Sequence, residues 1–212
     1  MPQKASKGQS YPIPTKEARL LVQDVTERLE KSADPKAKTF IERYLKTVES
    51  RGNKVPAIKA PATATLKAAP CALSSDIYSA AFLLLLSKFT DDKYAGLMFM
   101  SRRLILSGAI FEPPNVVLRD RLLDDVSALF DSGVVDNWSE CDGLCGHVIG
   151  PFVARHPHRS TIADSVLHTV DDVLIARHDP YRLPIGQLEY HVAYRDCILL
   201  SYIYQYIIVY QL

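Results

Sequence analysis

Two side chains that could act together in chemistry stand four positions apart, at residues 138 and 142. Trp138 is the only tryptophan of the chain, and Asp142 is a carboxylate four residues after it. On an α-helix, residues at i and i+4 share one face, so the indole ring and the carboxylate would project side by side. A carboxylate beside apolar residues is costly to desolvate unless it is paired or used. Taken alone, the pair also fits a surface acid beside a core ring.

An apolar stripe predicts the helix that would carry this pair. At roughly 100° per residue, five side chains fall on one helical face: Cys141, Cys145, Val148, Ile149 and Phe152. Asp142 lies on the edge of that stripe, next to Trp138 and Ile149. The helix is therefore expected to bury the stripe and to leave Asp142 at its border.

Cys141, Cys145 and His147 also invite a metal interpretation. Their spacing lies within one helix and lacks a second Cys/His cluster elsewhere, which structural zinc sites require. Cysteines on an apolar stripe more often pack in a core. No metal and no cofactor are therefore expected. His156 and His158 flank Pro157 in a predicted turn and are expected to be solvated.

Composition narrows the class of protein. The 212 residues are 48% hydrophobic and 23% charged, and the formal net charge is +1, as in ordinary globular proteins. The four cysteines are too few for a disulfide framework in a chain of this size, and residues 1–16 lack the apolar core of a cleavable signal. An intracellular location is expected, nuclear in a eukaryote and otherwise cytoplasmic or nucleoid-associated.

Helical periodicity extends over most of the chain. Capping residues, turn residues and apolar spacing predict a succession of helices, with starts or ends at Thr15, Asp34-Pro35, Gly52, Ser74 or Ser75, Asp91-Asp92, Gly108, Asn115 and Ser160 or Thr161. Residues 54–70 predict only a short helix between loops. The expected fold is all-α, with stacked antiparallel helical pairs.

The two ends of the chain differ from this pattern. Residues 1–14 are predicted to be a flexible arm, and residues 15–178 the helical domain. Residues 179–212 form a divergent tail rich in tyrosine and isoleucine, a composition that favours strand over helix. Its apolar run from 197 to 212 is too short and too interrupted to suggest a membrane span.

Several segments, in their order and spacing, resemble the AlkD-like DNA alkylation repair family. The similarity covers roughly residues 15–178 and rests on the following segments: Asp34-Pro35-Lys36-Ala37 with Arg43-Tyr44-Leu45-Lys46, Lys93 to Leu97, Trp138 with Asp142, then Gly150, Phe152, His156 and Pro157, and Arg177 about one helical hairpin later.

The resemblance implies a HEAT-like superhelix (an ARM-like α-α fold) with a basic groove for duplex DNA. It also implies a glycosylase that hydrolyses the N-glycosidic bond of alkylated purines such as 3-methyladenine and 7-methylguanine. Carried over by position, Asp142 would be the catalytic carboxylate, Trp138 a ring against the sugar, and Arg177 a contact to the backbone. Lys46, Arg102 and Arg103 are further expected DNA contacts; the paired arginines also fit an ordinary charged helix face. The expected partner is double-stranded DNA with alkylated bases, bound by a monomer without a membrane.

A second function stays open. Aromatic residues usually precede the arginine in the family, where this chain has Leu167 and Leu174. The family's further helical pairs also find no match after His178. The alternative is a HEAT-like module that binds DNA or protein and has lost glycosylase activity.

Overall fold

The computed structural model describes residues 12–45, 48–135 and 137–156, and within these residues every regular element is a helix. The predicted all-α class is therefore confirmed. The predicted helix after residue 160, the tail and Arg177 lie outside the described residues. The division into arm, domain and tail stays a prediction.

The described elements fall into two compact units, one ending at residue 136 and the other beginning at Asn137. The longer helices of the first unit are α1 (Lys16–Lys31), α2 (Pro35–Leu45), α3 (Val55–Ala68), α4 (Ser74–Leu85), α5 (Thr90–Phe99) and α6 (Val116–Asp131). Three short segments join α5 to α6: the π-helical η1 (Met100–Ile105) and the 3₁₀ turns η2 (Ala109–Phe111) and η3 (Pro113–Asn115).

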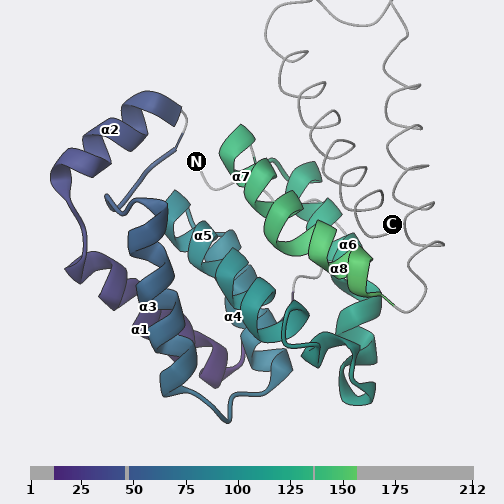
Figure 1. Ribbon diagram of the computed structural model, residues 1–212. Coiled ribbons are helices and arrows are strands. Elements are labelled where there is room, and N and C mark those ends of the chain that lie inside the picture. Colours follow the sequence, from purple (N-terminus) through teal and green to yellow (C-terminus); the bar gives the residue numbers. More distant parts are fainter. Residues whose placement is uncertain (1–11, 46–47, 136, 157–212) are drawn as a thin grey trace, which may run out of the picture. The chain divides into compact units, whose positions relative to one another are not determined.

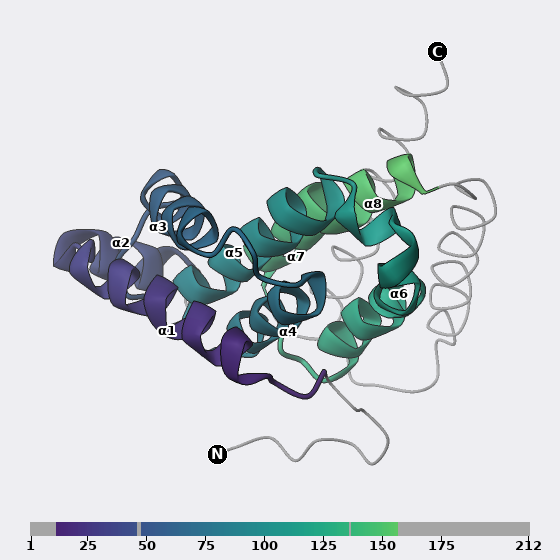
Figure 2. The same ribbon diagram turned by 90° about the horizontal axis from the view of Figure 1, so that it is seen from below.

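Helices α1, α3, α4 and α5 form two layers. Helix α1 packs against α3 and α4, and α5 packs against both α3 and α4. Figure 1 shows α3 beside α5, with α1 and α4 behind them, and in the turned view of Figure 2 α1 and α4 lie below α3 and α5. This is the stacking of antiparallel helical pairs that the periodicity predicted.

Gly96 allows α4 and α5 to approach closely. A Cβ atom added at this position would lie 2.7 Å from the backbone oxygen of Ala81 and 3.1 Å from the Cβ of Leu84. A hydrogen in place of a side chain is therefore required at this crossing. Fully buried side chains from both helices, among them Tyr78, Phe82 and Phe99, complete the core beside it.

Two predicted helix starts are confirmed by hydrogen bonds. The Thr15 hydroxyl accepts a bond from the Ala18 backbone N–H at 3.0 Å, and the Asp34 carboxylate accepts one from the Lys36 N–H at 2.9 Å. These bonds satisfy N–H groups that the first helical turn leaves without a partner. Predicted capping by Ser74 or Ser75 is wrong, because Leu73 precedes α4 and offers no polar side chain.

Three other expectations need correction. Helix α3 is far longer than the short helix predicted for residues 54–70, because Pro56 falls in its first turn and Pro61 is buried and accommodated within it. Helix α2 ends at Leu45, before Gly52. The apolar spacing after Asn115 predicts that Val117, Leu122, Val126 and Leu129 face inward; the last three are buried in α6, but Val117 is 73% exposed.

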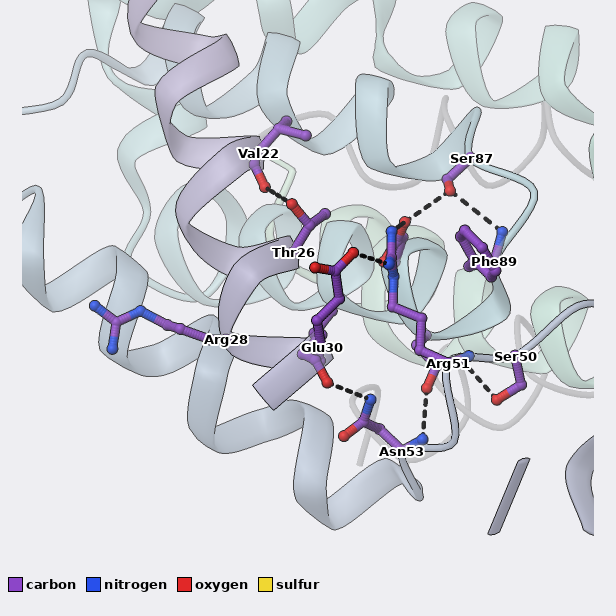
Figure 3. Close-up of polar contacts among 12 residues, drawn as sticks. Val22, Thr26, Arg28, Glu30, Ser50, Arg51, Asn53, Ser87 and Phe89 are labelled. Atoms are coloured by element: carbon purple, nitrogen blue, oxygen red, sulfur yellow. Dashed lines mark hydrogen bonds and ion pairs between the residues drawn. The ribbon is translucent and has the colours of Figure 1, made fainter. Parts of the chain in front are cut away.

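A polar network ties the loop before α3 to the start of α5 (Figure 3). Arg51 donates from Nε to one Asp92 oxygen at 2.7 Å and from Nη2 to the other at 3.0 Å. Its third nitrogen reaches Glu30 at 2.6 Å, and the guanidinium lies 4.2 Å from the centre of the Phe89 ring. Asp92 also accepts a bond from the Ser87 hydroxyl. The network therefore joins the end of α1, the loop before α3 and the start of α5.

The second unit is described from Asn137 to His156. It is a continuous helical rod formed by α7 (Trp138–Leu144), the π-helical η4 (Cys145–Ile149) and α8 (Gly150–Arg155). Pro151 has no backbone N–H and cannot donate to the preceding turn. The π segment lies directly before Gly150-Pro151, where the regular bonding pattern has to change.

Candidate nucleic-acid site

The Trp138/Asp142 helix begins at an asparagine cap. The side-chain oxygen of Asn137 accepts a bond from the Glu140 N–H at 3.1 Å, and its carbonyl accepts one from Cys141 at 3.1 Å. Helix α7 starts at the next residue, Trp138. The cap therefore sets the register that places Asp142 in the middle of the short helix.

The predicted apolar stripe is buried. Cys141, Cys145, Val148, Ile149 and Phe152 are each at most 5% exposed. Asp142 lies beside them as a half-buried residue, as its place on the edge of the stripe predicted. The spacing of the apolar residues was enough to find this arrangement.

The Asp142 carboxylate has one oxygen removed from solvent. Oδ1 is buried and accepts no hydrogen bond from any of the described residues. Burial raises the pKa of the Asp142 carboxyl above its usual range. A buried carboxylate oxygen without a donor is costly in a purely structural role. This combination is typical of a carboxylate held ready for a ligand or a proton.

Cys141 directly precedes Asp142, and Cys145 follows Cys141 by one helical turn. Both cysteines are buried, and neither forms a disulfide bond with another of the described residues. The hydrogen bond with Cys141 and burial raise the pKa of the Cys145 thiol, so that it stays protonated at neutral pH. Within the described ranges, no three His, Cys, Asp or Glu residues converge as metal ligands would. The two cysteines act there as small apolar packing groups.

The predicted DNA contacts Arg102 and Arg103 lie in the first unit, on η1. Arg102 is exposed and donates from Nη1 to the hydroxyl of Thr63 on α3. Arg103 donates from Nη2 to the Pro70 carbonyl at 2.5 Å. Exposed Lys59 and Lys67 stand four positions before and after Thr63, so they share its face of α3. Four cations thus gather along the α3–η1 face.

Comparison with known proteins then decides the family. Residues 25–172, more than half of the chain, match the model of the family described as DNA alkylation repair enzyme. The chain belongs to this DNA alkylation repair family. A search of curated proteins and a search of solved structures each gave no match.

Membership of the DNA alkylation repair family supports an enzymatic role in DNA repair, with DNA as the partner. The match contains the capped helix of Asp142, the α3–η1 face and the Arg51 network. None of the described helices combines the length and the hydropathy that crossing a membrane would require.

Three further residues that the family resemblance singled out cannot be placed in full. Lys46 and Arg177 lie outside the described residues, and of Trp138 only the backbone is described. Their predicted roles stay predictions. The structure places Asp142 in one unit and Arg102 and Arg103 in the other.

Sequence reasoning missed Thr63 and misjudged His156. Thr63 stands midway in a Lys-x-x-x-Thr-x-x-x-Lys spacing, and that pattern was the available signal. His156 is 7% exposed instead of solvated, and its ring packs 5.3 Å from that of Phe152. Phe152 and His156 are four residues apart, so the end of α8 folds the histidine onto the apolar stripe.

Proposed function

We propose that this protein is a DNA glycosylase that hydrolyses the N-glycosidic bond of alkylated purines in duplex DNA. Its substrates would be bases such as 7-methylguanine and 3-methyladenine. The observation that carries the proposal is the Asp142 carboxylate, with a buried oxygen that receives no bond from the described residues and a raised pKa. Membership of the DNA alkylation repair family supplies the partner.

The chemistry of the substrate suits a lone carboxylate. An N3- or N7-alkylated purine already carries positive charge and is a good leaving group. As the glycosidic bond breaks, positive charge develops on the deoxyribose. A carboxylate placed against that sugar stabilises the charge electrostatically, and its effect is larger where water is excluded.

Asp142 would have a second task. The free oxygen can accept a proton from the water that attacks the sugar, which is general-base catalysis. A raised pKa makes the ionised carboxylate a stronger base than an exposed aspartate. In this proposal the indole of Trp138 adds an aromatic face that attracts the same cationic character.

The α3–η1 face supports binding of the duplex. Cations that neutralise phosphates provide affinity without reading the base sequence. Such binding suits an enzyme that must find a damaged base in any sequence. It also predicts strong dependence on salt.

A base-release assay tests the proposal. Duplex DNA containing a single 7-methylguanine, or a 3-methyladenine, is incubated at low salt with the wild type, with Asp142→Asn and with Asp124→Asn, an exposed carboxylate on α6. We expect release by the wild type and by Asp124→Asn, and a loss of about 10²–10³-fold in Asp142→Asn.

The same assay separates the two functions left open by the sequence. No release by the wild type, with duplex binding retained, would favour a non-catalytic DNA-binding module. Equal release by the wild type and Asp142→Asn would remove Asp142 from the mechanism while leaving the activity in place.

A further inference from the structure

The two arginines on η1 are held differently from four other arginines of the first unit. Four arginines there pair with carboxylates: Arg28 with Asp24, Arg51 with Asp92, Arg119 with Asp120, and Arg121 with Asp125. Arg102 and Arg103 instead donate to a hydroxyl and a carbonyl, both neutral acceptors. Among the described residues, no carboxylate forms an ion pair with either of them.

The surrounding sequence explains why no carboxylate competes. Residues 54–75, which include α3, contain no Asp or Glu, and neither do residues 93–111, which include η1. The two segments are neighbours, because α3 packs against α5 and Arg102 reaches across to Thr63. This face therefore carries positive charge without an internal counter-charge.

A neutral acceptor orients a guanidinium without cancelling its charge. A carboxylate partner would have to be displaced before a phosphate could bind, whereas a hydroxyl or carbonyl need not be. An oriented side chain also loses less rotamer freedom when it binds. Each arginine donates one N–H group to its neutral acceptor, and its other N–H groups can bind a phosphate.

Thr63 is suited to this positioning role. Its hydroxyl donates to the Lys59 carbonyl at 2.6 Å within α3, so its lone pairs are turned towards the donor Arg102. Lys59 and Lys67 extend the line of cations on both sides of it. A valine at this position has nearly the same shape and would keep neither bond.

We propose that Thr63 is a positioning residue: with the Pro70 carbonyl it presets Arg102 and Arg103 as a two-arginine clamp for DNA phosphates. The inference rests on the proposed function only for the identity of the partner, duplex DNA. Thr63 and the α3–α4 turn thus orient the two arginines, although neither of them carries a charge.

Binding of unmodified duplex DNA tests the clamp. Fluorescence anisotropy over a range of NaCl concentrations compares the wild-type chain with Thr63→Val, Thr63→Ser, Arg102→Gln and the double variant Thr63→Val/Arg102→Gln. Thr26→Val is the matched control, since Thr26 makes the same hydroxyl bond to the carbonyl four residues earlier, that of Val22, on α1 (Figure 3).

We expect Thr63→Val to weaken binding about 3- to 10-fold, the range expected for one hydrogen bond. Arg102→Gln should lower the slope of log K against log salt by about 0.9, one phosphate contact. Thr63→Val should also lower this slope. When Arg102→Gln is already present, adding Thr63→Val should cause no further loss of affinity for the duplex. Thr63→Ser and Thr26→Val should behave like the wild type.

Two results would overturn the clamp. One is that Thr63→Val lowers the affinity for the duplex equally in the wild-type chain and in the Arg102→Gln variant, because the threonine would then act independently of the arginine. The other is an unchanged salt slope in Arg102→Gln. Absence of duplex binding by the wild type at low salt would overturn the DNA partner as well. Normal binding that is indifferent to both residues overturns the clamp alone and leaves base release to be judged by its own assay.

Discussion

Asp142 combines features that stability alone would not select. Most buried polar atoms in proteins have a hydrogen-bond partner, but Oδ1 of Asp142 receives none from the described residues. The first unit shows the contrast, since Asp91 accepts bonds from the Ser50 hydroxyl and from the backbone N–H groups of Arg51 and Asn53. The Asp91 carboxylate holds a loop with these three bonds, whereas Oδ1 of Asp142 holds no part of the described structure.

Asp142 should therefore reduce stability at neutral pH. Burial raises its pKa, so the folded chain holds this proton more tightly than the unfolded chain does. Its contribution is most favourable below the ordinary aspartate pKa of about 4 and is lost as the pH rises through the raised pKa. We expect Asp142→Asn to raise the Tm at pH 7 by about 2 °C or less, because the group is only partly buried.

Thermal unfolding between pH 3 and pH 8 measures this effect. The gain of Asp142→Asn should vanish at the acid end, where the wild-type carboxyl is protonated as well. The variant Asp124→Asn, at an exposed position of α6, is measured alongside it as the control for removing a carboxylate. A variant that is less stable than the wild type at pH 7 would show that the carboxylate has a stabilising partner in solution.

At the scale of elements, the described π-helical segments occur on the helices that carry predicted site residues. Arg102 and Arg103 lie within η1, and η4 begins three residues after Asp142. A π segment inserts extra backbone into a turn and re-aims the side chains that follow it, which is why such segments are frequent at functional sites. In η4 the proline at 151 supplies the physical cause.

The element that fixes the α3–α5 layer is the loop at residues 49–53. Its backbone is held by Asp91 at the start of α5, and we expect Asp91→Ala to lower the free energy of unfolding by about 3 kcal/mol. The reason is that two backbone N–H groups and one hydroxyl would lose their acceptor inside the protein. Urea unfolding monitored by circular dichroism measures the change.

Asp120→Ala serves as the control for Asp91→Ala. Asp120 is largely exposed and pairs with Arg119 on the surface of α6, so its removal should cost less than about 1 kcal/mol. Similar costs for the two variants would mean that the Asp91 bonds are replaced by water at little expense.

For the whole molecule, the distribution of charge matters more than its sum. The chain has a formal net charge of only +1. Yet the α3–η1 face gathers Lys59, Lys67, Arg102 and Arg103 over two segments that have no carboxylate. A near-neutral protein can therefore present a local field that attracts a polyanion.

A pair of charge reversals tests this distribution. Lys59→Glu/Lys67→Glu should weaken binding to duplex DNA by roughly tenfold or more at moderate salt, because two phosphate-facing cations become anions. Lys16→Glu/Lys31→Glu changes the net charge by the same amount on α1, in the other layer (Figure 2). Anisotropy titrations at one salt concentration compare the two. Equal losses would attribute binding to net charge instead of to this face.

Features that depend on near neighbours in the chain could be predicted from the amino-acid sequence. Thr15 and Asp34 cap helices because a short polar side chain reaches N–H groups two or three residues ahead. The stripe from Cys141 to Phe152 is buried because its spacing matches the helical repeat. The all-α class follows from the same local periodicity.

Contacts between residues far apart in the chain could not be predicted from the sequence, because they depend on how the helices pack. The bond from Arg102 to Thr63 joins residues 39 positions apart, and that from Arg103 to Pro70 joins residues 33 apart. The Asp91 network spans a similar separation. Such choices depend on how helices stack and on where a glycine such as Gly96 lets them approach, and no local pattern encodes that distance. The spacing of Trp138 and Asp142 predicted where a carboxylate could act, while packing left one of its oxygens buried without a partner among the described residues.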